Sequence, residues 1–301
     1  MKTDEKYERY GLGGNPFEHL STQRLATISR SHANLSIDDQ LGDVKASVFH
    51  QKQKALITLI GREGFGKTER ILVAAKEAEN NNLFHAVFQV EENMRCAMEG
   101  LLQSLSPKGS TLLSNDKWER EIAGLKKKVR KGYNPRDVGT AIAAALNSNV
   151  PCFLLIDDLH RVLNAADSQL FFQTLSVVIQ KSIPGVFLLA TVDEATAFPQ
   201  PVVNLVQSMR THSFRLHPAT LEDAEKIVSK QLQSQRLVDG ISSTYPFTVE
   251  AVQRLNETAQ GNPLLLLSCA NVVLTAAAMQ KTISITDDIT TDALTVIQKQ
   301  S

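Results

Sequence analysis

The sequence has few cysteines and no excess of charge of either sign. Its 301 residues include three cysteines, Cys96, Cys152 and Cys269, which stand far apart. This spacing provides neither a disulfide framework nor a metal-binding motif, and it favours free thiols in a reducing compartment. Lysine and arginine together number 32, as do aspartate and glutamate, so the formal net charge is zero. Because the chain has no net charge to attract polyanions, contact with nucleic acid or anionic lipid has to come from a local basic patch or from many subunits together.

Long apolar runs, repeats and metal motifs are also missing. No apolar signal core follows residues 1–6, and no stretch of about eighteen residues is continuously apolar. We therefore expect a cytoplasmic protein without a membrane span. The seven histidines show no metal-ligand spacing. The content of 43% hydrophobic and 21% charged residues is ordinary for a soluble globular protein, so the chain has enough apolar residues for a proper core.

The strongest positive signal is a glycine-rich segment with the pattern G-x-x-x-x-G-K-T. It consists of Gly61, Arg62, Glu63, Gly64, Phe65, Gly66, Lys67 and Thr68. The apolar run 55–60 before it predicts a strand, and apolar residues at helical spacing from 71 to 78 predict a helix after it. This context is typical of a loop that binds a nucleotide polyphosphate. The alternative, a plain glycine turn with a solvated lysine, does not explain why both flanking elements match.

Each part of this motif has a predicted chemical task. The glycines let backbone N–H groups face the phosphates, and the start of the helix adds the positive end of its dipole. We expect Lys67 to reach the β- and γ-phosphates of ATP and the hydroxyl of Thr68 to ligate Mg²⁺.

The remaining pattern predicts an α/β fold, a three-layer αβα P-loop core with a parallel sheet. Strands are expected at residues 55–60, 84–90, 151–157, 185–191 and 213–217. Helices are expected at residues 36–53, 91–105, 117–131, 137–146, 167–181, 220–236, 249–259, 264–279 and 291–298. Strands that are apolar on both faces and separated by helices form parallel sheets covered on both sides.

The domain organisation follows from where the strands stop. Residues 1–54 are expected to form an N-terminal segment and linker, 55–218 the core, and 219–301 a small all-α domain. Thr220 and Asp223 form a capping box at its first helix. The third helix, 264–279, is apolar nearly all round and is expected to be buried.

A second chemical signal is the apolar run that ends in Asp157 and Asp158. At the end of a strand next to a phosphate loop, Asp157 would hold Mg²⁺ with Thr68. Asp158 would orient the attacking water as a general base. The alternative for both is a strand end that caps the next helix. Thr191 and Asp193 end the following predicted strand, where one polar side chain could touch the γ-phosphate or orient water; the alternative is a plain strand-end turn. Of the two residues we favour Thr191, because a neutral donor suits the γ-phosphate better than a carboxylate.

Two arginines and a group of lysines leave more than one interpretation open. Arg210 or Arg215 could reach the γ-phosphate of a neighbouring subunit as an arginine finger, or form a surface salt bridge. The basic cluster Lys126, Lys127, Lys128, Arg130 and Lys131 is either a solvated helix end or a contact for nucleic acid.

With these features in this order, the chain resembles the AAA+ ATPases over nearly its whole length. Within them it is most similar to origin-recognition initiators and transposition-regulator ATPases, with the signalling NTPases called STAND as close relatives. Residues 10–17 resemble the loop that these proteins place near the adenine, which implies nucleotide contacts for Asn15 and Pro16. Residues 261–264 resemble their lid turn facing the nucleotide, which implies a contact for Pro263.

Two departures from the resemblance concern catalysis. Asp158 stands where these ATPases usually carry glutamate, and Leu264 stands where many have a sensor arginine. The main hypothesis is an ATPase that binds Mg-ATP between subunits of a homo-oligomer and hydrolyses it slowly to control assembly on DNA or the activity of a protein partner. The alternatives are a nucleotide-gated adaptor with negligible hydrolysis, or a secretion or pilus accessory ATPase.

Overall fold

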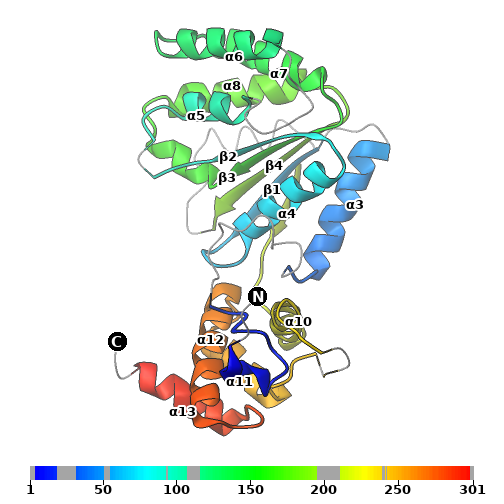
Figure 1. Ribbon diagram of the computed structural model, residues 1–301. Helices are drawn as coiled ribbons and strands as arrows, with labels where there is room; N and C mark the ends of the chain where they lie inside the picture. The colour runs from blue at the N-terminus through cyan, green and yellow to red at the C-terminus, as the bar shows by residue number, and fades with distance from the viewer. Residues whose placement is uncertain are drawn as a thin grey trace. The chain divides into compact units, whose positions relative to one another are not determined.

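The computed structural model describes residues 4–18, 32–50, 55–92, 94–106, 116–194, 211–238, 241 and 243–298 (Figure 1). The chain divides into two compact units. Residues 1–38, 63–69 and 217–301 form one, called here the helical unit, and residues 39–62 and 70–216 form the other, called the sheet unit. The N-terminal segment therefore groups with the C-terminal helices, which the sequence pattern did not indicate.

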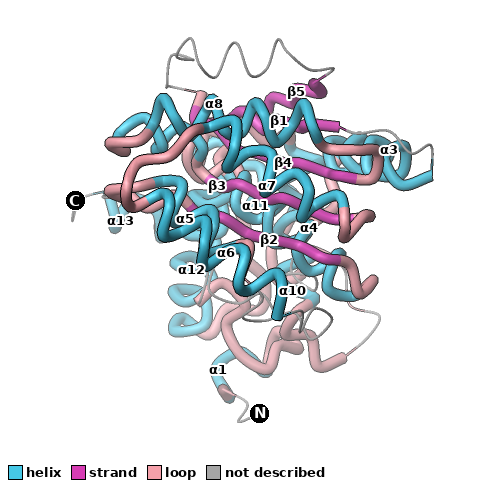
Figure 2. The backbone as a smooth tube through the Cα atoms, turned by 90° about the horizontal axis from the view of Figure 1, so that it is seen from above, coloured by secondary structure: helices cyan, strands magenta, loops and turns pink. Residues whose placement is uncertain are grey.

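The described strands of the sheet unit form one parallel sheet. They are β1 (Ala55–Gly61), β2 (Phe84–Gln89), β3 (Cys152–Asp157), β4 (Val186–Asp193) and β5 (Thr211–Arg215). Their order is β2-β3-β4-β1-β5 and every neighbouring pair is parallel (Figure 2). The register sets Gly61 opposite Asp193, and Gln89 opposite Asp157. The carboxyl ends of β1, β3 and β4 consequently meet at one edge, as the predicted α/β core requires.

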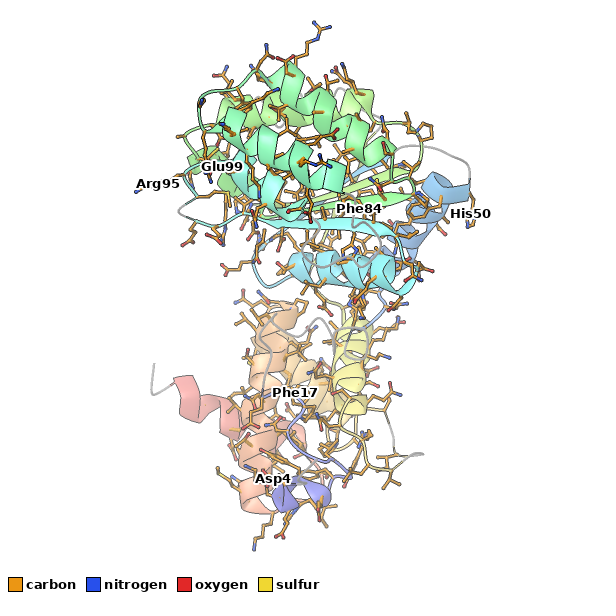
Figure 3. All side chains as sticks on the ribbon, turned by 45° about the horizontal axis from the view of Figure 1, so that its top comes forward. Asp4, Phe17, His50, Phe84, Arg95 and Glu99 are labelled. Carbon is orange, nitrogen blue, oxygen red and sulfur yellow. The ribbon has the colours of Figure 1, made fainter. Side chains whose placement is uncertain are left out.

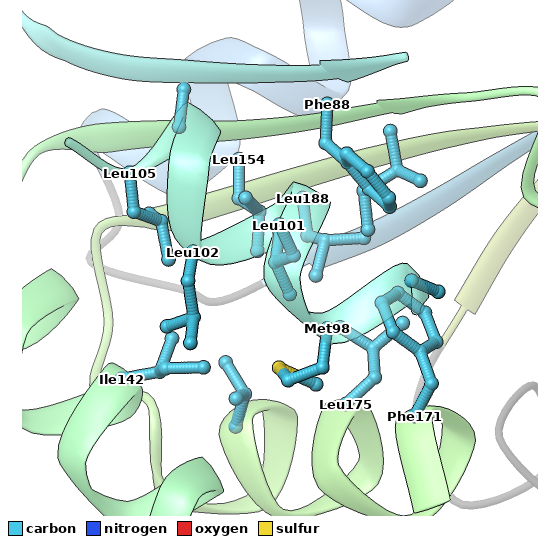
Figure 4. Close-up of a cluster of buried hydrophobic side chains, with 14 of the residues drawn as sticks. Phe88, Met98, Leu101, Leu102, Leu105, Ile142, Leu154, Phe171, Leu175 and Leu188 are labelled. Atoms are coloured by element: carbon cyan, nitrogen blue, oxygen red, sulfur yellow. The ribbon is translucent and has the colours of Figure 1, made fainter. Parts of the chain in front are cut away.

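Helices cover both faces of the sheet, which confirms the predicted three layers (Figure 1). On one face lie α3 (Ser36–His50) and α4 (Lys67–Asn80). On the other face lie α5 (Ala97–Ser104), α7 (Pro135–Asn147) and α8 (Ser168–Lys181), and α6 (Asp116–Val129) packs outside against α5. The alternation of strand side chains explains both cores, because successive residues point to opposite faces. Figure 4 shows the second core, with Met98, Leu101, Leu102, Ile142, Leu154, Phe171, Leu175 and Leu188.

Tertiary contacts set one helix boundary that the sequence prediction missed. The predicted helix 91–105 begins only at Ala97. The carboxylate of Asp167, from a loop seventy residues away, accepts hydrogen bonds from Ala97 N (2.7 Å) and Met98 N (3.1 Å). It thereby satisfies donors that a helix start leaves open, while Cys96 at the N-cap position makes no side-chain cap. Between β3 and α8 the chain also forms an unpredicted 3₁₀ helix, η1 (Leu159–Asn164).

The helical unit contains α1 (Glu5–Glu8), α10 (Leu221–Gln233), α11 (Val249–Thr258), α12 (Pro263–Gln280) and α13 (Asp287–Gln298). The predicted capping box starts α10, since Thr220 Oγ1 accepts from Asp223 N (3.2 Å) and Asp223 Oδ2 accepts from Thr220 N (3.1 Å). The apolar side chains of the N-terminal segment complete the core of this unit, with Phe17 packed among its helices (Figure 3). They are Tyr7, Tyr10, Leu12 and Phe17.

The prediction that α12 is buried all round was wrong. Its buried side chains include Leu266, Ala270 and Leu274, which pack against α10 and α11, but Leu264 and Leu265 are about half exposed and Met279 is 72% exposed. Among the residues that the structure describes, α12 is the one helix with the length and composition of a membrane span. The helix has more apolar residues than its one packed face needs. A core helix of a soluble protein can have the same length and composition as a membrane span, so these two properties do not distinguish the two cases.

Candidate nucleotide-binding site

The glycine loop joins β1 to α4, as predicted. The strand ends at Gly61 and the helix begins at Lys67. Between them Gly64 (φ 81°) and Gly66 (φ 80°) adopt left-handed backbone conformations, which residues with a Cβ rarely take. Alternation of right- and left-handed residues turns successive N–H groups toward one point and makes a concave anion site. The loop therefore has the backbone that phosphate binding needs.

The loop side chains divide into anchored and exposed ones. Phe65 is buried and fixes the loop to the protein interior, while Arg62 and Glu63 are exposed. Lys67 is only 7% exposed, which is unusual for a charged side chain. Thr68 follows it in the first turn of α4.

Within the helical unit, the turn before α12 lies directly on the loop backbone. Asn262 Nδ2 donates to the carbonyl of Glu63 (3.0 Å), and Leu264 N donates to the carbonyl of Gly64 (3.3 Å). A Cβ at position 64 would lie 2.5 Å from Asn262 Oδ1, so this approach also requires glycine. The same Asn262 Oδ1 accepts from Leu264 N (3.0 Å) and Leu265 N (3.3 Å) and thus caps α12, in which Pro263 is the first residue.

The two predicted acids lie at the end of β3, in the sheet unit. Asp157 is 1% exposed, and Thr191, on the neighbouring strand β4, is fully buried. Thr191 Oγ1 donates to Asp157 Oδ1 (2.6 Å) and accepts from Asp158 N (2.8 Å). A buried carboxylate needs such hydrogen bonds to offset its lost hydration. The structure thus brings Asp157, Asp158 and Thr191 together, with the threonine holding both acids in place.

Asp158 has an unusual backbone and a charged neighbour. Its φ of 55° and ψ of 43° are left-handed, at the N-cap position of η1. Its Oδ2 lies 3.4 Å from Arg161 Nε, and its side chain is 18% exposed. A left-handed aspartate is tolerated better than most residues but still carries a small cost, and such positions cluster at functional sites. Arg161 is a site residue that the sequence analysis did not single out.

The end of β4 carries a second group of polar contacts. Asp193 N donates to His160 Nδ1 (3.3 Å), which joins this strand end to η1. The carboxylate of Glu194 lies 3.4 Å from Arg215 and 3.8 Å from Arg62. Arg215, one of the two predicted finger residues, is therefore in an ion pair within its own chain. Arg210, the other, lies outside the described residues.

The predicted adenine-side loop is fixed on the helical unit. Asn15 Nδ2 donates to Asn271 Oδ1 (2.7 Å) and Thr275 Oγ1 (3.1 Å), both on α12. The carbonyl of Pro16 accepts from Gln231 on α10. These bonds give the segment a defined position. The Asn15 amide is thus engaged with α12, and Pro16 is buried.

A buried ion cluster next to the loop helix was missed by the sequence analysis, which gave the histidines no role. His32 is 8% exposed; its Nδ1 lies 2.7 Å from Glu69 Oε1 and its Nε2 lies 3.5 Å from Asp38 Oδ1. Burial by itself would lower the pKa of His32, but the hydrogen bonds and charges of Asp38 and Glu69 outweigh it and raise the pKa to about 9. Glu69 directly follows Thr68, so this imidazolium fixes the first turn of α4.

These residues fit Mg-ATP by their chemistry. Main-chain N–H groups and a lysine suit a polyphosphate, while a threonine hydroxyl and a carboxylate are hard oxygen donors of the kind Mg²⁺ takes alongside phosphate and water. No group of three or more His, Cys, Asp or Glu side chains with metal-binding proximity occurs in the described part of the chain.

Comparison with solved structures identifies the fold, whereas comparison with protein families and curated proteins finds no match. No family model and no curated protein matches the sequence. The chain is similar to the Holliday junction branch migration motor RuvB of Thermotoga maritima, at 15% identity over 88% of this chain and 70% of that one (TM-score 0.51). It is also similar to the Orc1 protein of Aeropyrum pernix in complex with DNA, at 14% identity over 96% and 69% (TM-score 0.55). A third similar structure is Drosophila ORC bound to DNA, at 18% identity over 91% and 66% (TM-score 0.53). The chain thus has the α/β P-loop fold of these AAA+ ATPases.

Proposed function

We propose that this protein is an ATPase of the AAA+ type, which binds Mg-ATP and hydrolyses it slowly. The observation that carries the proposal is the buried Asp157 at the end of β3, held by Thr191 on the adjacent strand β4. The strand on the other side of β4 is β1, which leads directly into the glycine loop. A P-loop and a fixed carboxylate at the same sheet edge are the two parts that nucleotide hydrolysis in this fold requires.

The binding roles follow from the residue types. The backbone N–H groups of residues 61–68 and the side chain of Lys67 would hold the phosphates, and Thr68 and Asp157 would hold Mg²⁺. Bound Mg²⁺ offsets the negative charge that develops on the phosphate oxygens. Asn15, Pro16 and Pro263 would lie on the base side of the nucleotide.

Slow turnover is proposed because the water-orienting group is short and restrained. Asp158 would position the attacking water, yet it reaches less far than a glutamate and its carboxylate is paired with Arg161. Arg210, or Arg215 once released from Glu194, would act on the nucleotide of a neighbouring subunit. Thr191 would act by positioning Asp157 and Asp158.

The nucleotide state would control an assembly on DNA or the activity of a protein partner. Supporting this, the similar structures include a Holliday junction branch migration motor, an Orc1 protein in complex with DNA, and ORC bound to DNA. ATP binding shifts such proteins between conformations only if it contacts the two states differently. The bond from Asn262 to the loop backbone provides one contact that a bound triphosphate would alter.

Isothermal titration calorimetry with ATP and Mg²⁺ tests the proposal. Wild-type protein should release heat on binding, and Lys67→Ala should abolish it. Lys76→Ala, which removes a lysine from the exposed part of the same helix where it pairs with Glu79, is the matched control and should bind as wild type. If wild type showed neither heat nor a thermal shift, the ATPase proposal would be abandoned.

A second candidate function is a nucleotide-gated adaptor without turnover. Two observations favour it. Asp158 forms an ion pair with Arg161, and the uncharged Leu264 stands where an arginine would contact the γ-phosphate. Single-turnover hydrolysis, with and without DNA, separates the two functions. Hydrolysis that DNA stimulates supports the first, and tight binding without any product supports the adaptor.

A further inference from the structure

A basic surface in the sheet unit has no part in the proposed nucleotide site. It is called here the basic ridge and consists of Lys127, Lys128, Arg130, Lys131 and Arg136, all exposed. The ridge lies at the end of α6 and the beginning of α7. Residues 122–136 contain six basic and no acidic side chains, in a chain whose total formal charge is zero.

The packing of α6 forces these side chains outward. Ile122, Leu125 and Val129 of α6 are buried in the core, which fixes the rotation of the helix. The lysines lie on the opposite face of the helix, which faces solvent when the apolar stripe is buried. Figure 1 shows α6 outermost among the helices on its side of the sheet.

Neighbouring carboxylates do not neutralise the ridge. Arg130 Nε lies 2.6 Å from Glu99 Oε1, on the surface of α5 (Figure 3). Lys126, beside the ridge, bonds the uncharged amide of Gln103. For Lys127, Lys128, Lys131 and Arg136, the described residues provide no ion pair within 4 Å. Four cations thus remain available to an external anion.

A helix end explains only part of this charge. Cations in the last turn of a helix interact favourably with its dipole, which accounts for Lys126, Lys127 and Lys128. Arg136, however, lies in the first turn of α7, where the dipole opposes a cation. The chain turns between the two helices at Gly132, which has a left-handed φ of 93° and open space around it. Asp137 in the first turn of α7 supplies the negative charge that the start of this helix favours, but basic side chains stand on both sides of the turn between the helices, which the dipole of α6 alone does not explain.

We propose that the basic ridge binds the phosphate backbone of DNA without reading its sequence. Flexible lysines suit phosphate contacts, which position a protein on DNA but carry no sequence information. The ridge offers little for base stacking, because Tyr133 is half-buried and its hydroxyl donates to Asp167 (3.2 Å). An anionic membrane fits less well. The large exposed apolar side chains described in the sheet unit are Val150, Leu170 and Ile183, none of them on α6, so the ridge lacks apolar anchors.

This inference deepens the proposed function, on which its biological meaning rests, since it names the surface that would keep an ATP-dependent assembly on DNA. The experiment measures fluorescence anisotropy of a short labelled DNA duplex over a range of salt concentrations. The ridge variant is K127E/K128E/K131E. The matched control is K6E/K226E/K230E, which makes the same change in net charge on side chains of the helical unit.

The ridge variant should bind DNA at least about tenfold more weakly than wild type. The slope of log K against log salt should become less negative by about 2 to 3, because each lost phosphate contact removes about 0.9 from its magnitude. The control should stay within about twofold of wild type, since its lysines lie off the ridge. Equal losses in both variants, or no DNA binding by wild type at low salt, would overturn the inference.

Two further measurements keep the outcome unambiguous. Thermal unfolding and ATP calorimetry of the ridge variant should match wild type, because its substitutions are exposed and distant in sequence from residues 61–68. Wild type that binds DNA through the ridge but not ATP would refute the proposed function and leave this inference standing. Binding to vesicles rich in phosphatidylserine, without binding to DNA, would assign the ridge to a membrane surface and refute the inference.

Discussion

The hydroxyl of Thr191 donates a hydrogen bond of 2.6 Å to Oδ1 of Asp157, across two neighbouring strands. Both residues are buried, and the same hydroxyl accepts the main-chain N–H of Asp158. One side chain on β4 therefore sets the position of both acids at the end of β3. This arrangement makes Thr191 the positioning residue of the proposed site.

The substitution Thr191→Val should destabilise the protein and reduce turnover. Valine has the same shape but no hydroxyl, so a buried oxygen of Asp157 and the N–H of Asp158 lose their partner, which costs about 1–3 kcal/mol of unfolding free energy. Urea denaturation and single-turnover hydrolysis measure the two effects. Thr191→Ser, which keeps the hydroxyl, should retain most of the turnover. A valine variant with wild-type turnover would remove Thr191 from its role.

The substitution Asp158→Asn should preserve ATP binding and stop hydrolysis. The amide keeps the size of the side chain but cannot take a proton from water, so only the chemical step is affected. Calorimetry and single-turnover measurements on the same preparation separate binding from chemistry. Unchanged turnover in Asp158→Asn would show that another group orients the water.

The partner substitution Arg161→Gln tests whether the ion pair restrains Asp158. Without the guanidinium 3.4 Å away, the carboxylate loses this restraint on its position, and hydrolysis should rise severalfold. The double variant with Asp158→Asn should be as inactive as Asp158→Asn alone. Lower turnover in Arg161→Gln would instead assign Arg161 a direct role.

The substitution Asn262→Asp separates two tasks of one side chain. Aspartate keeps an oxygen that caps α12, but it cannot donate to the carbonyl of Glu63 and repels it. Asn262→Asp should lose about 1 kcal/mol of unfolding free energy through the missing bond to Glu63, and Asn262→Ala should lose about 1 kcal/mol more through the missing cap. Both variants should bind ATP with altered affinity, measured by calorimetry. An effect on affinity in the alanine variant alone would show that only the cap matters.

The stability of the protein should depend on the charge of His32. Its pKa in the folded protein is raised to about 9, against 6.5 for an ordinary histidine, so the protonated form favours folding. This contribution is complete below about pH 6.5 and is lost as the pH rises through about 9; it amounts to about 3 kcal/mol at most.

Unfolding free energies of wild type and His32→Gln, measured between these pH values, check this contribution. The difference between the two proteins should shrink as the pH rises. His212→Gln, which removes an exposed histidine stacked on Phe214, is the control and should show no such trend. A constant difference for His32→Gln across the range would contradict a charged His32.

Local patterns predicted most of the elements and the position of the glycine loop. The apolar strands, the glycine loop and the capping box at Thr220 depend on neighbours within a few residues, and each lies where it was predicted. The start of α5 was misplaced because its cap, Asp167, comes from a distant loop. The burial of α12 was overestimated because composition shows how apolar a helix is, but not which of its faces a neighbour covers.

The sequence by itself determined that a strand, a glycine loop and a helix follow one another with two acids at a later strand end. Short-range sterics, local hydrogen bonding and side-chain periodicity depend only on residues close together in the sequence, so they can be predicted from it. Only the tertiary structure decided that Thr191 holds Asp157, that Arg161 holds Asp158, and that His32 lies between Asp38 and Glu69. Thr191 and Asp157, like His32 and Glu69, lie far apart in the sequence, so only the packing of the chain brings them within hydrogen-bond distance. Asp158 and Arg161 are close in sequence, and their contact depends on the unpredicted 3₁₀ helix η1.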